Sequence, residues 1–279
     1  MSRWLPDDWQ FTLAPDSVLV ARTPHRFGRG DRRQAPQVTG QAVAHRGEQR
    51  QPWAAALAVL ADSIAGAGVG GRATVILANQ FVRYALVPWS DLIESEEEGL
   101  SLSRHYLHET YGAAAERWQL RIDPEEASDL KLISAVEPEL LEDLRRLYAG
   151  SRLRLVSIQP RLMALCNRHR RRLAGGDTWL ALVEPNSLCL ALLQDQHFAA
   201  LRQVRVGDAW AAELVTTLER ESLLVDAAAA VRHVFVAAAG VAEPRFAVGM
   251  PWTIEWLEPL MPAQAPTPTD RPLAAATGG

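Results

Sequence analysis

The chain has 279 residues, 48% of them hydrophobic and 22% charged, which is typical of a globular protein and excludes a disordered, collagen-like or coiled-coil one. Its 29 Lys and Arg residues against 33 Asp and Glu residues give a formal net charge of -4, which argues against a dedicated nucleic-acid-binding protein. The length allows one large domain or two lobes of about 100–150 residues each.

The sequence predicts neither a signal peptide nor a membrane-spanning helix. The N-terminus lacks the basic stretch and apolar run of a signal peptide, and no window approaches the roughly 20 consecutive apolar residues that span a bilayer. Cys166 and Cys189 lie in apolar stretches without a CxxC partner, which indicates reduced, buried thiols. We therefore expect a cytoplasmic protein that reaches a membrane only through a partner.

The first 173 residues alternate predicted strands and helices. The patterns predict a β-hairpin at 11–21 and a polar loop with a weak strand at 28–51. Two strands around a short turn are predicted at 73–89, and single strands at 118–122, 130–136 and 153–158. Helices are predicted at 53–64, 95–112, 139–149 and 161–173. Pro15 and Asp16 interrupt the alternation of the hairpin and form its turn.

After Gly175 and Gly176 the pattern starts again. Three strands are predicted at 179–183, 188–194 and 198–206. A helix at 208–224 and a strand at 231–237 follow, with short elements after them. The Pro-, Ala- and Thr-rich tail at 262–279 is predicted to be disordered.

An internal similarity suggests a duplication. Residues Ala14–Ala21 align with Glu184–Ala191 at a constant offset of 170 residues, and both read as strand, Pro-Asx-Ser turn, strand. Coincidence is the simpler explanation, because Pro and Asx residues favour such turns wherever they occur. Each hairpin, however, opens a run of strands followed by a helix, so we expect a duplicated two-lobe α/β protein.

Two motifs that often mark ligand sites are better explained by local structure. Gly66–Gly71 matches GxGxxG, but a helix precedes it and a strand follows, the reverse of the dinucleotide-binding order. His105 and His108 share a helix face, yet a zinc site needs further ligands that are not spaced to help. There is also no GxSxG, P-loop or HExxH motif, so no catalytic site is evident.

The basic run Arg168–Arg172 falls at the end of a predicted helix, where cations complement the helix dipole. We expect a solvated helix end, with contact to anionic head groups or to an acidic partner surface as the alternative.

Three segments together resemble the actin-like family that includes the type IV pilus protein PilM and the cytoplasmic domain of the type II secretion protein GspL. Lys131–Ala164 is similar to a strand, helix and strand of that family that lead into the junction between its lobes. Ala73–Pro88 resembles an inserted strand pair before the small subdomain. Ala181–Gly207 resembles the opening of the second lobe, three strands that end in Gly before a long helix.

The resemblance implies a duplicated, actin-like (ribonuclease H-like) two-lobe α/β fold with a small inserted α+β subdomain. The first lobe would span residues 1–158 with the insertion at about 73–136. The second lobe would span residues 159–261, before the disordered tail at 262–279.

The first phosphate loop departs from the family pattern. Active members carry Asp-x-Gly-x-x-Ser/Thr in the first hairpin, where Asp positions hydrated magnesium and Gly lets the backbone approach phosphate. These two slots fall on Ala14 and Asp16, with Ser17 next to them. Pro15 removes a backbone donor, and the Asp16 carboxylate would repel a polyphosphate by about 1 kcal/mol at ~4 Å in water and more near a protein surface.

The second phosphate loop is also altered. Glu184 retains a carboxylate, but the glycine slot is Asn186, followed by Ser187. The adenosine-side Gly-Gly slot reads Ala238-Ala239-Gly240. Two damaged phosphate loops imply an actin-like fold without nucleotide chemistry, and hence no cofactor and no metal.

The resemblance thus implies a catalytically inactive scaffold of a type IV pilus or type II secretion inner-membrane platform. Its partner would be a bitopic inner-membrane protein resembling PilN, whose cytoplasmic segment docks on the lobes, with an assembly ATPase platform as a further partner. Two alternatives stay open. One is an active ATP- and magnesium-dependent ATPase or kinase of the same fold, with Glu184 and Asp208 as metal-site carboxylates, and the other is an unrelated α/β binding protein.

The partner contact is predicted on the strand pair at 73–89. Phe81 and Arg83 share one strand face in this prediction, with Tyr84 on the other, and Trp89 follows. Aromatic and Arg side chains are enriched at binding hot spots. If Phe81 and Arg83 do not make the contact, the cleft between the lobes is the alternative groove.

Overall fold

The structure is a computed structural model that describes residues 7–24, 37–43, 51–90, 93, 95–124, 129–225, 228, 230–241, 244, 246 and 249–261. Its helices are α1 (Ala54–Ala65), α2 (Glu96–Tyr111), α3 (Pro138–Ala149), α4 (Arg161–Leu173) and α5 (Trp210–Leu224), with 3₁₀ turns η1 (Asn79–Phe81) and η2 (Gly112–Arg117). Within these ranges, none of the helices is long and apolar enough to cross a membrane. The tail predicted to be disordered, 262–279, lies outside the described residues.

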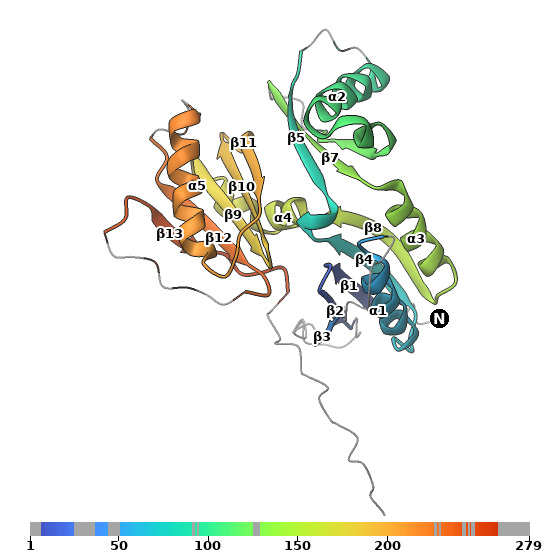
Figure 1. The fold of residues 1–279 in the computed structure, drawn as a ribbon. Helices are drawn as coiled ribbons and strands as arrows, with labels where there is room; N and C mark the ends of the chain where they lie inside the picture. The colour runs from blue at the N-terminus through green and yellow to red at the C-terminus, as the bar shows by residue number, and fades with distance from the viewer. Residues whose placement is uncertain are drawn as a thin grey trace, which may run out of the picture.

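Two five-stranded sheets share one topology (Figure 1). The first runs β3-β2-β1-β4-β8, with strands at Gln37–Ala42, Ser17–Thr23, Asp7–Leu13, Gly71–Leu77 and Leu153–Pro160. The second runs β11-β10-β9-β12-β13, with strands at His197–Val204, Ser187–Gln194, Thr178–Glu184, His233–Ala238 and Thr253–Trp256. In each, three antiparallel strands are extended by two parallel ones. The predicted duplication of a two-lobe α/β fold is confirmed.

The helices and strands lie close to their predicted bounds, because their local signals are strong. In α2, for example, the Ser95 hydroxyl accepts a hydrogen bond from the Glu98 amide, and the Glu98 carboxylate accepts one from the Ser95 amide. This reciprocal cap fixes the start of the helix. The weak strand predicted within 28–51 is β3.

The two lobes share one hydrophobic core. One face of the second sheet, with Leu180 and Leu182, belongs to the same buried cluster as Phe11 and Leu60 of the first lobe. The other face packs against α5, and so every residue of β9 is buried. Helix α4 lies between the two sheets (Figure 1). The lobes are therefore joined by apolar packing as well as by the chain.

The insertion between β4 and α3 is a separate small layer. Its sheet has the order β5-β7-β6, with strands at Arg83–Pro88, Leu130–Val136 and Gln119–Ile122, and α2 packs against it. Its own buried cluster consists of Val87, Leu107, Ala115, Trp118, Ile133 and Ala135.

The two strands and the short turn predicted at 73–89 are present as β4, η1 and β5, but the prediction that the strands pair with each other is wrong. β4 lies in the first sheet between β1 and β8, whereas β5 pairs with β7 in the small sheet. The residues between them form the 3₁₀ turn η1 rather than a hairpin turn, and this turn sends the chain into the other layer. Phe81 therefore lies in η1, so the prediction that it shares a strand with Arg83 and Tyr84 is wrong as well.

The glycine-rich segment 66–71 follows α1 and leads into β4, as its helix-before-strand order predicted. Gly66 caps α1. A Cβ on Gly71 would lie 2.4 Å from the Asp7 carbonyl oxygen and 2.6 Å from the Trp9 ring, so this glycine permits close packing of β4 on β1.

The two helix histidines each face a glutamate. His105 Nε2 lies 3.6 Å from Glu109, and His108 Nδ1 lies 3.2 Å from Glu116. Across the described residues, no three His, Cys, Asp or Glu side chains form a group able to hold a metal ion.

Candidate functional site

The carboxylate retained in the second phosphate loop is closed off by two donors. Glu184 ends β9 and is 1% exposed. One oxygen accepts a hydrogen bond from the Asn79 amide at 2.9 Å, and the other accepts one from Arg161, itself buried at the start of α4. A buried charge is tolerated only when it is paired and hydrogen-bonded, as it is here. Both oxygens of Glu184 are thus engaged by the protein. We call this arrangement the Glu184 clamp.

The Glu184 clamp belongs to a wider contact between the lobes. The Gln80 amide donates to the Pro185 carbonyl at 2.9 Å, so η1 of the first lobe is bound to the hairpin turn of the second. Gln203 of β11 donates to the carbonyls of Asn79 and Val82, each at 3.2 Å. These bonds hold the two lobes in one arrangement.

The residues on either side of the two Pro-Asx turns pair in the same way. The Ala14 amide donates to the Ser17 carbonyl at 2.9 Å, and Glu184 pairs with Ser187 in the equivalent place. In the first turn the Ser17 hydroxyl donates to the Asp16 carboxylate at 3.1 Å. The Asp16 carboxylate is thus already hydrogen-bonded within its own turn.

Only the second turn keeps a backbone conformation that favours glycine. Asn186 has φ 60°, whereas Asp16 is not among the described residues with positive φ. Asn is one of the few non-glycine residues that tolerate this region, so the turn is kept although the glycine is replaced.

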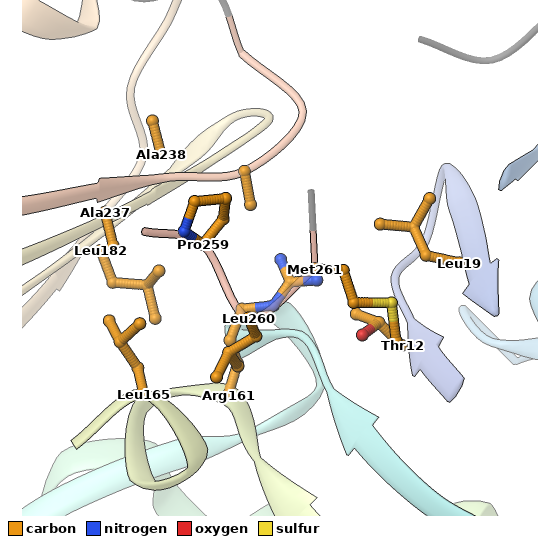
Figure 2. A pocket seen from close by; sticks show the side chains of 11 residues that line it. Thr12, Leu19, Arg161, Leu165, Leu182, Ala237, Ala238, Pro259, Leu260 and Met261 are labelled. Atoms are coloured by element: carbon orange, nitrogen blue, oxygen red, sulfur yellow. The ribbon is translucent and has the colours of Figure 1, made fainter. Parts of the chain in front are cut away.

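A small pocket lies between the lobes. Its lining comes from both lobes and from the C-terminal strand's continuation: Thr12, Leu19, Arg161, Leu165, Leu182, Ala237, Ala238, Ala239, Pro259, Leu260 and Met261 (Figure 2). The remaining volume is about 20 Å³, roughly that needed for one water molecule. Most of these side chains are apolar, which suits protein packing and not a polyphosphate.

Residues Leu257–Met261, which we call the cleft segment, contribute three of the lining residues, Pro259, Leu260 and Met261. The Leu257 amide donates to the Val236 carbonyl at 2.8 Å, and its side chain is 3% exposed. His169 Nε2 lies 2.8 Å from the Glu258 carbonyl oxygen. Met261 is 5% exposed and packs against Ala21 and Val38 of the first lobe. The cleft segment thus touches both lobes.

The basic run at the end of α4 helps to hold this part of the chain. Arg172 pairs with Glu255 of β13, and Arg168 lies 3.6 Å from the Glu258 carboxylate. His169, within the run, is buried. The predicted solvated helix end is confirmed for the four arginines, which are all exposed, although Arg168 and Arg172 also contact the cleft segment and the C-terminal strand.

The adenosine-side slot meets the cleft segment as well. Ala238 and Ala239 line the same space as Leu260 and Met261. Gly240 has φ 73° and keeps the turn that follows β12. The residues that the resemblance assigns to adenosine thus face the protein's own chain.

A second, larger pocket lies where the first lobe meets the small subdomain. It has a volume of about 310 Å³, and we call it the junction pocket. Its lining comprises Gln51, Pro52, Trp53, Gln80, Phe81, Arg83, Trp118, Ala135, Glu137 and Glu139. Phe81 and Arg83, the predicted partner-contact residues, therefore line one cavity although they do not share a strand. Tyr84 is buried and donates to Asn79 instead.

The remaining candidate groups are Asp208 and the two cysteines. Asp208 is exposed, just before α5. Burial raises the pKa of the Cys166 thiol to about 12 and raises the pKa of Cys189 strongly as well. Both thiols stay protonated at neutral pH and are poor nucleophiles.

No protein-family model matches the chain, and no curated protein matches it in sequence. Among solved structures, the PilM–PilN type IV pilus biogenesis complex aligns with a TM-score of 0.59 at 15% identity, covering 84% of this chain and 81% of that one. The chain has the actin-like fold.

Two further solved structures support this fold. The cytoplasmic domain of EpsL, an inner-membrane component of the type II secretion system of Vibrio cholerae, aligns with a TM-score of 0.57 at 10% identity over 90% of both chains. A Bacteroides thetaiotaomicron protein with an actin-like ATPase fold and unknown function aligns with a TM-score of 0.57 at 10% identity, over 87% of this chain and 86% of that one. The predicted resemblance is confirmed for the fold.

Proposed function

We propose that this protein is a catalytically inactive actin-like scaffold of a type IV pilus or type II secretion inner-membrane platform. It binds the cytoplasmic segment of a bitopic, PilN-like inner-membrane protein and is cytoplasmic, held at the membrane by that partner. It uses no nucleotide or metal cofactor. The fold shared with the PilM–PilN complex and with the EpsL cytoplasmic domain supports the proposed role in a pilus or secretion platform.

The observation that carries the inactive part of the proposal is the Glu184 clamp. A magnesium site needs oxygen ligands with free lone pairs. Glu184 is the carboxylate retained in the phosphate loops, and it is neutralised by Arg161 and hydrogen-bonded by the Asn79 amide. The cleft segment occupies the neighbouring space between the lobes. Magnesium-ATP would have to compete with the Glu184 clamp for this carboxylate and with the cleft segment for the neighbouring space.

We expect millimolar magnesium-ATP to leave the melting temperature unchanged in differential scanning fluorimetry. A ligand present at 100 times its dissociation constant would add about 2.7 kcal/mol of stability, which is easily seen. Magnesium alone and ATP with EDTA are the controls. An upward shift that requires both ATP and magnesium would overturn the inactive scaffold and favour the active ATPase or kinase.

Partner binding is proposed at the junction pocket, through Phe81 and Arg83. The test uses a synthetic peptide of the cytoplasmic N-terminal segment of a PilN-like single-span protein. Arg83→Ala and Phe81→Leu should each weaken binding in a fluorescence-anisotropy titration by about tenfold or more, as expected for hot-spot residues. Arg205→Ala, at an exposed arginine of the second lobe, is the matched control and should bind as wild type does.

Melting temperatures of all four proteins are compared first, since Phe81 is buried. Wild-type affinity in both pocket variants would move the docking site to another surface. No binding by the wild type would contradict the partner assignment itself.

A further inference from the structure

The 3₁₀ turn η1 takes part in two sites at once. Gln80 and Phe81 line the junction pocket, whereas Asn79 is 1% exposed and its amide donates to Glu184 of the second lobe. Backbone hydrogen bonds close this short turn, so its pocket side cannot move far without its second-lobe side.

Four hydrogen bonds join η1 and the residue after it to the second lobe. The Asn79 amide and the Gln80 side chain donate to the hairpin between β9 and β10, each at 2.9 Å. The Gln203 side chain of β11 donates to the carbonyls of Asn79 and Val82, each at 3.2 Å. All four join residues more than 100 positions apart in the sequence, so they exist only while the lobes are in contact.

On the pocket side, Arg83 is bound to the same turn. Its Nη1 donates to the carbonyls of Gln80 at 3.0 Å and Val82 at 3.3 Å. The Val82 carbonyl therefore accepts from Arg83 of the pocket and from Gln203 of the second lobe. Nε and Nη2 of Arg83 have no hydrogen-bond partner in the described part of the chain, so a ligand can bind them while Nη1 keeps its bonds.

Loss of the lobe contact would remove part of the pocket wall. A shift of η1 that breaks the four bonds displaces Gln80 and Phe81 from the lining. Local openings of this kind have their own free energy, which is smaller than that of global unfolding. A ligand that needs the complete pocket binds only the closed arrangement, and by mass action it stabilises that arrangement.

We propose that η1 links the junction pocket to the contact between the lobes. The partner's cytoplasmic segment binds while the four hydrogen bonds are formed, and its binding strengthens them. This inference rests on the proposed function for the identity of the ligand. Because linkage is reciprocal, a change in the second lobe alters the affinity for the partner, and partner binding alters the stability of the second lobe's contact.

Gln203→Ala tests the link from the second lobe. Gln203 is outside the pocket lining, and the variant removes two of the four bonds. We expect the PilN-like peptide to bind it about three- to tenfold more weakly in the anisotropy titration, the effect of losing one or two hydrogen bonds. Arg205→Ala, at an exposed residue that follows the same strand, is the matched control. Wild-type affinity in Gln203→Ala would overturn the link.

Hydrogen exchange measured by mass spectrometry tests the link from the pocket. Saturating peptide should slow exchange about three- to tenfold in β11 and in residues 184–189, none of which line the pocket. Helix α5 packs on the opposite face of the second sheet and should exchange as before. Peptide binding without slower exchange in the second lobe would overturn the link and leave the proposed function standing.

A third measurement needs no peptide. Arg83→Ala removes the two bonds that connect the pocket side to η1, so it should speed exchange about two- to fivefold in residues 78–82 and 184–189. Arg121→Ala, at an exposed arginine of β6, is the matched control. Wild-type exchange rates in Arg83→Ala would overturn the link whether or not the peptide binds, whereas absence of peptide binding contradicts the proposed function.

Discussion

Arg161→Met should lower the free energy of unfolding by about 3–5 kcal/mol, because it leaves the buried Glu184 carboxylate without its counter-charge. For a chain of this size the loss amounts to a fall in melting temperature of roughly 10 °C. Urea unfolding followed by circular dichroism measures it. The methionine side chain fills much of the same volume, so the loss reports the charge more than a cavity.

The double variant Arg161→Met, Glu184→Gln tests that explanation. The glutamine side chain introduced there is neutral, and its carbonyl oxygen can still accept the Asn79 amide hydrogen bond, so most of the lost stability should return. Replacement of a buried ion pair by well-packed neutral groups is often neutral or stabilising. A single variant that loses less than about 1 kcal/mol would show that water reaches Glu184 and would remove the main support for an inactive site.

The sequence predicted the duplication well because the signal is local. Pro15 with Asp16, and Pro185 with Asn186, specify turns by their own backbone preferences, and apolar strand-forming residues lie on both sides of each turn. The same is true of α2, whose Ser95 and Glu98 form the N-terminal cap. Such features need no knowledge of distant residues.

Strand pairing and the Glu184 clamp were not predictable in this way. β4 and β5 are both good strands, and which sheet each one joins depends on β1 and β7, far away in the sequence. One signal for the Glu184 clamp was present. Arg161 begins a helix, where a positive charge opposes the dipole, and apolar residues follow it. A cation at that place indicates an anionic partner such as Glu184.

The sequence gives only a weak indication that the cleft segment is buried. Leu257, Leu260 and Met261 are apolar residues directly before a Pro-rich tail, a position where solvent exposure would be unfavourable. Nothing in that pattern indicates which surface covers them. Their place between the lobes follows from the path of β13, which is parallel to β12 and delivers the chain into the cleft.

Removal of the cleft segment should be the second large effect. A chain that ends at Trp256 loses the buried side chains of Leu257 and Met261, and each fully buried apolar side chain of this size contributes about 1.5–3 kcal/mol. We therefore expect a loss of about 3–6 kcal/mol and faster amide hydrogen exchange in β9, β12 and α4, which face the cleft. A chain that ends at Met261 is the matched control and should unfold like the full-length protein.

Point variants separate the loss of the cleft segment from a general effect of truncation. Met261→Ser should lower the free energy of unfolding and speed amide hydrogen exchange on the first-lobe side, near Ala21 and Val38. Met261→Leu keeps a similar apolar volume and should leave both close to the wild-type values. The opened cleft of the chain ending at Trp256 should still not bind magnesium-ATP, because Arg161 continues to hold Glu184. An unchanged free energy of unfolding in that chain would mean that the cleft segment contacts the lobes without stabilising them. Gain of nucleotide binding would instead identify the segment as an occupant that competes with nucleotide.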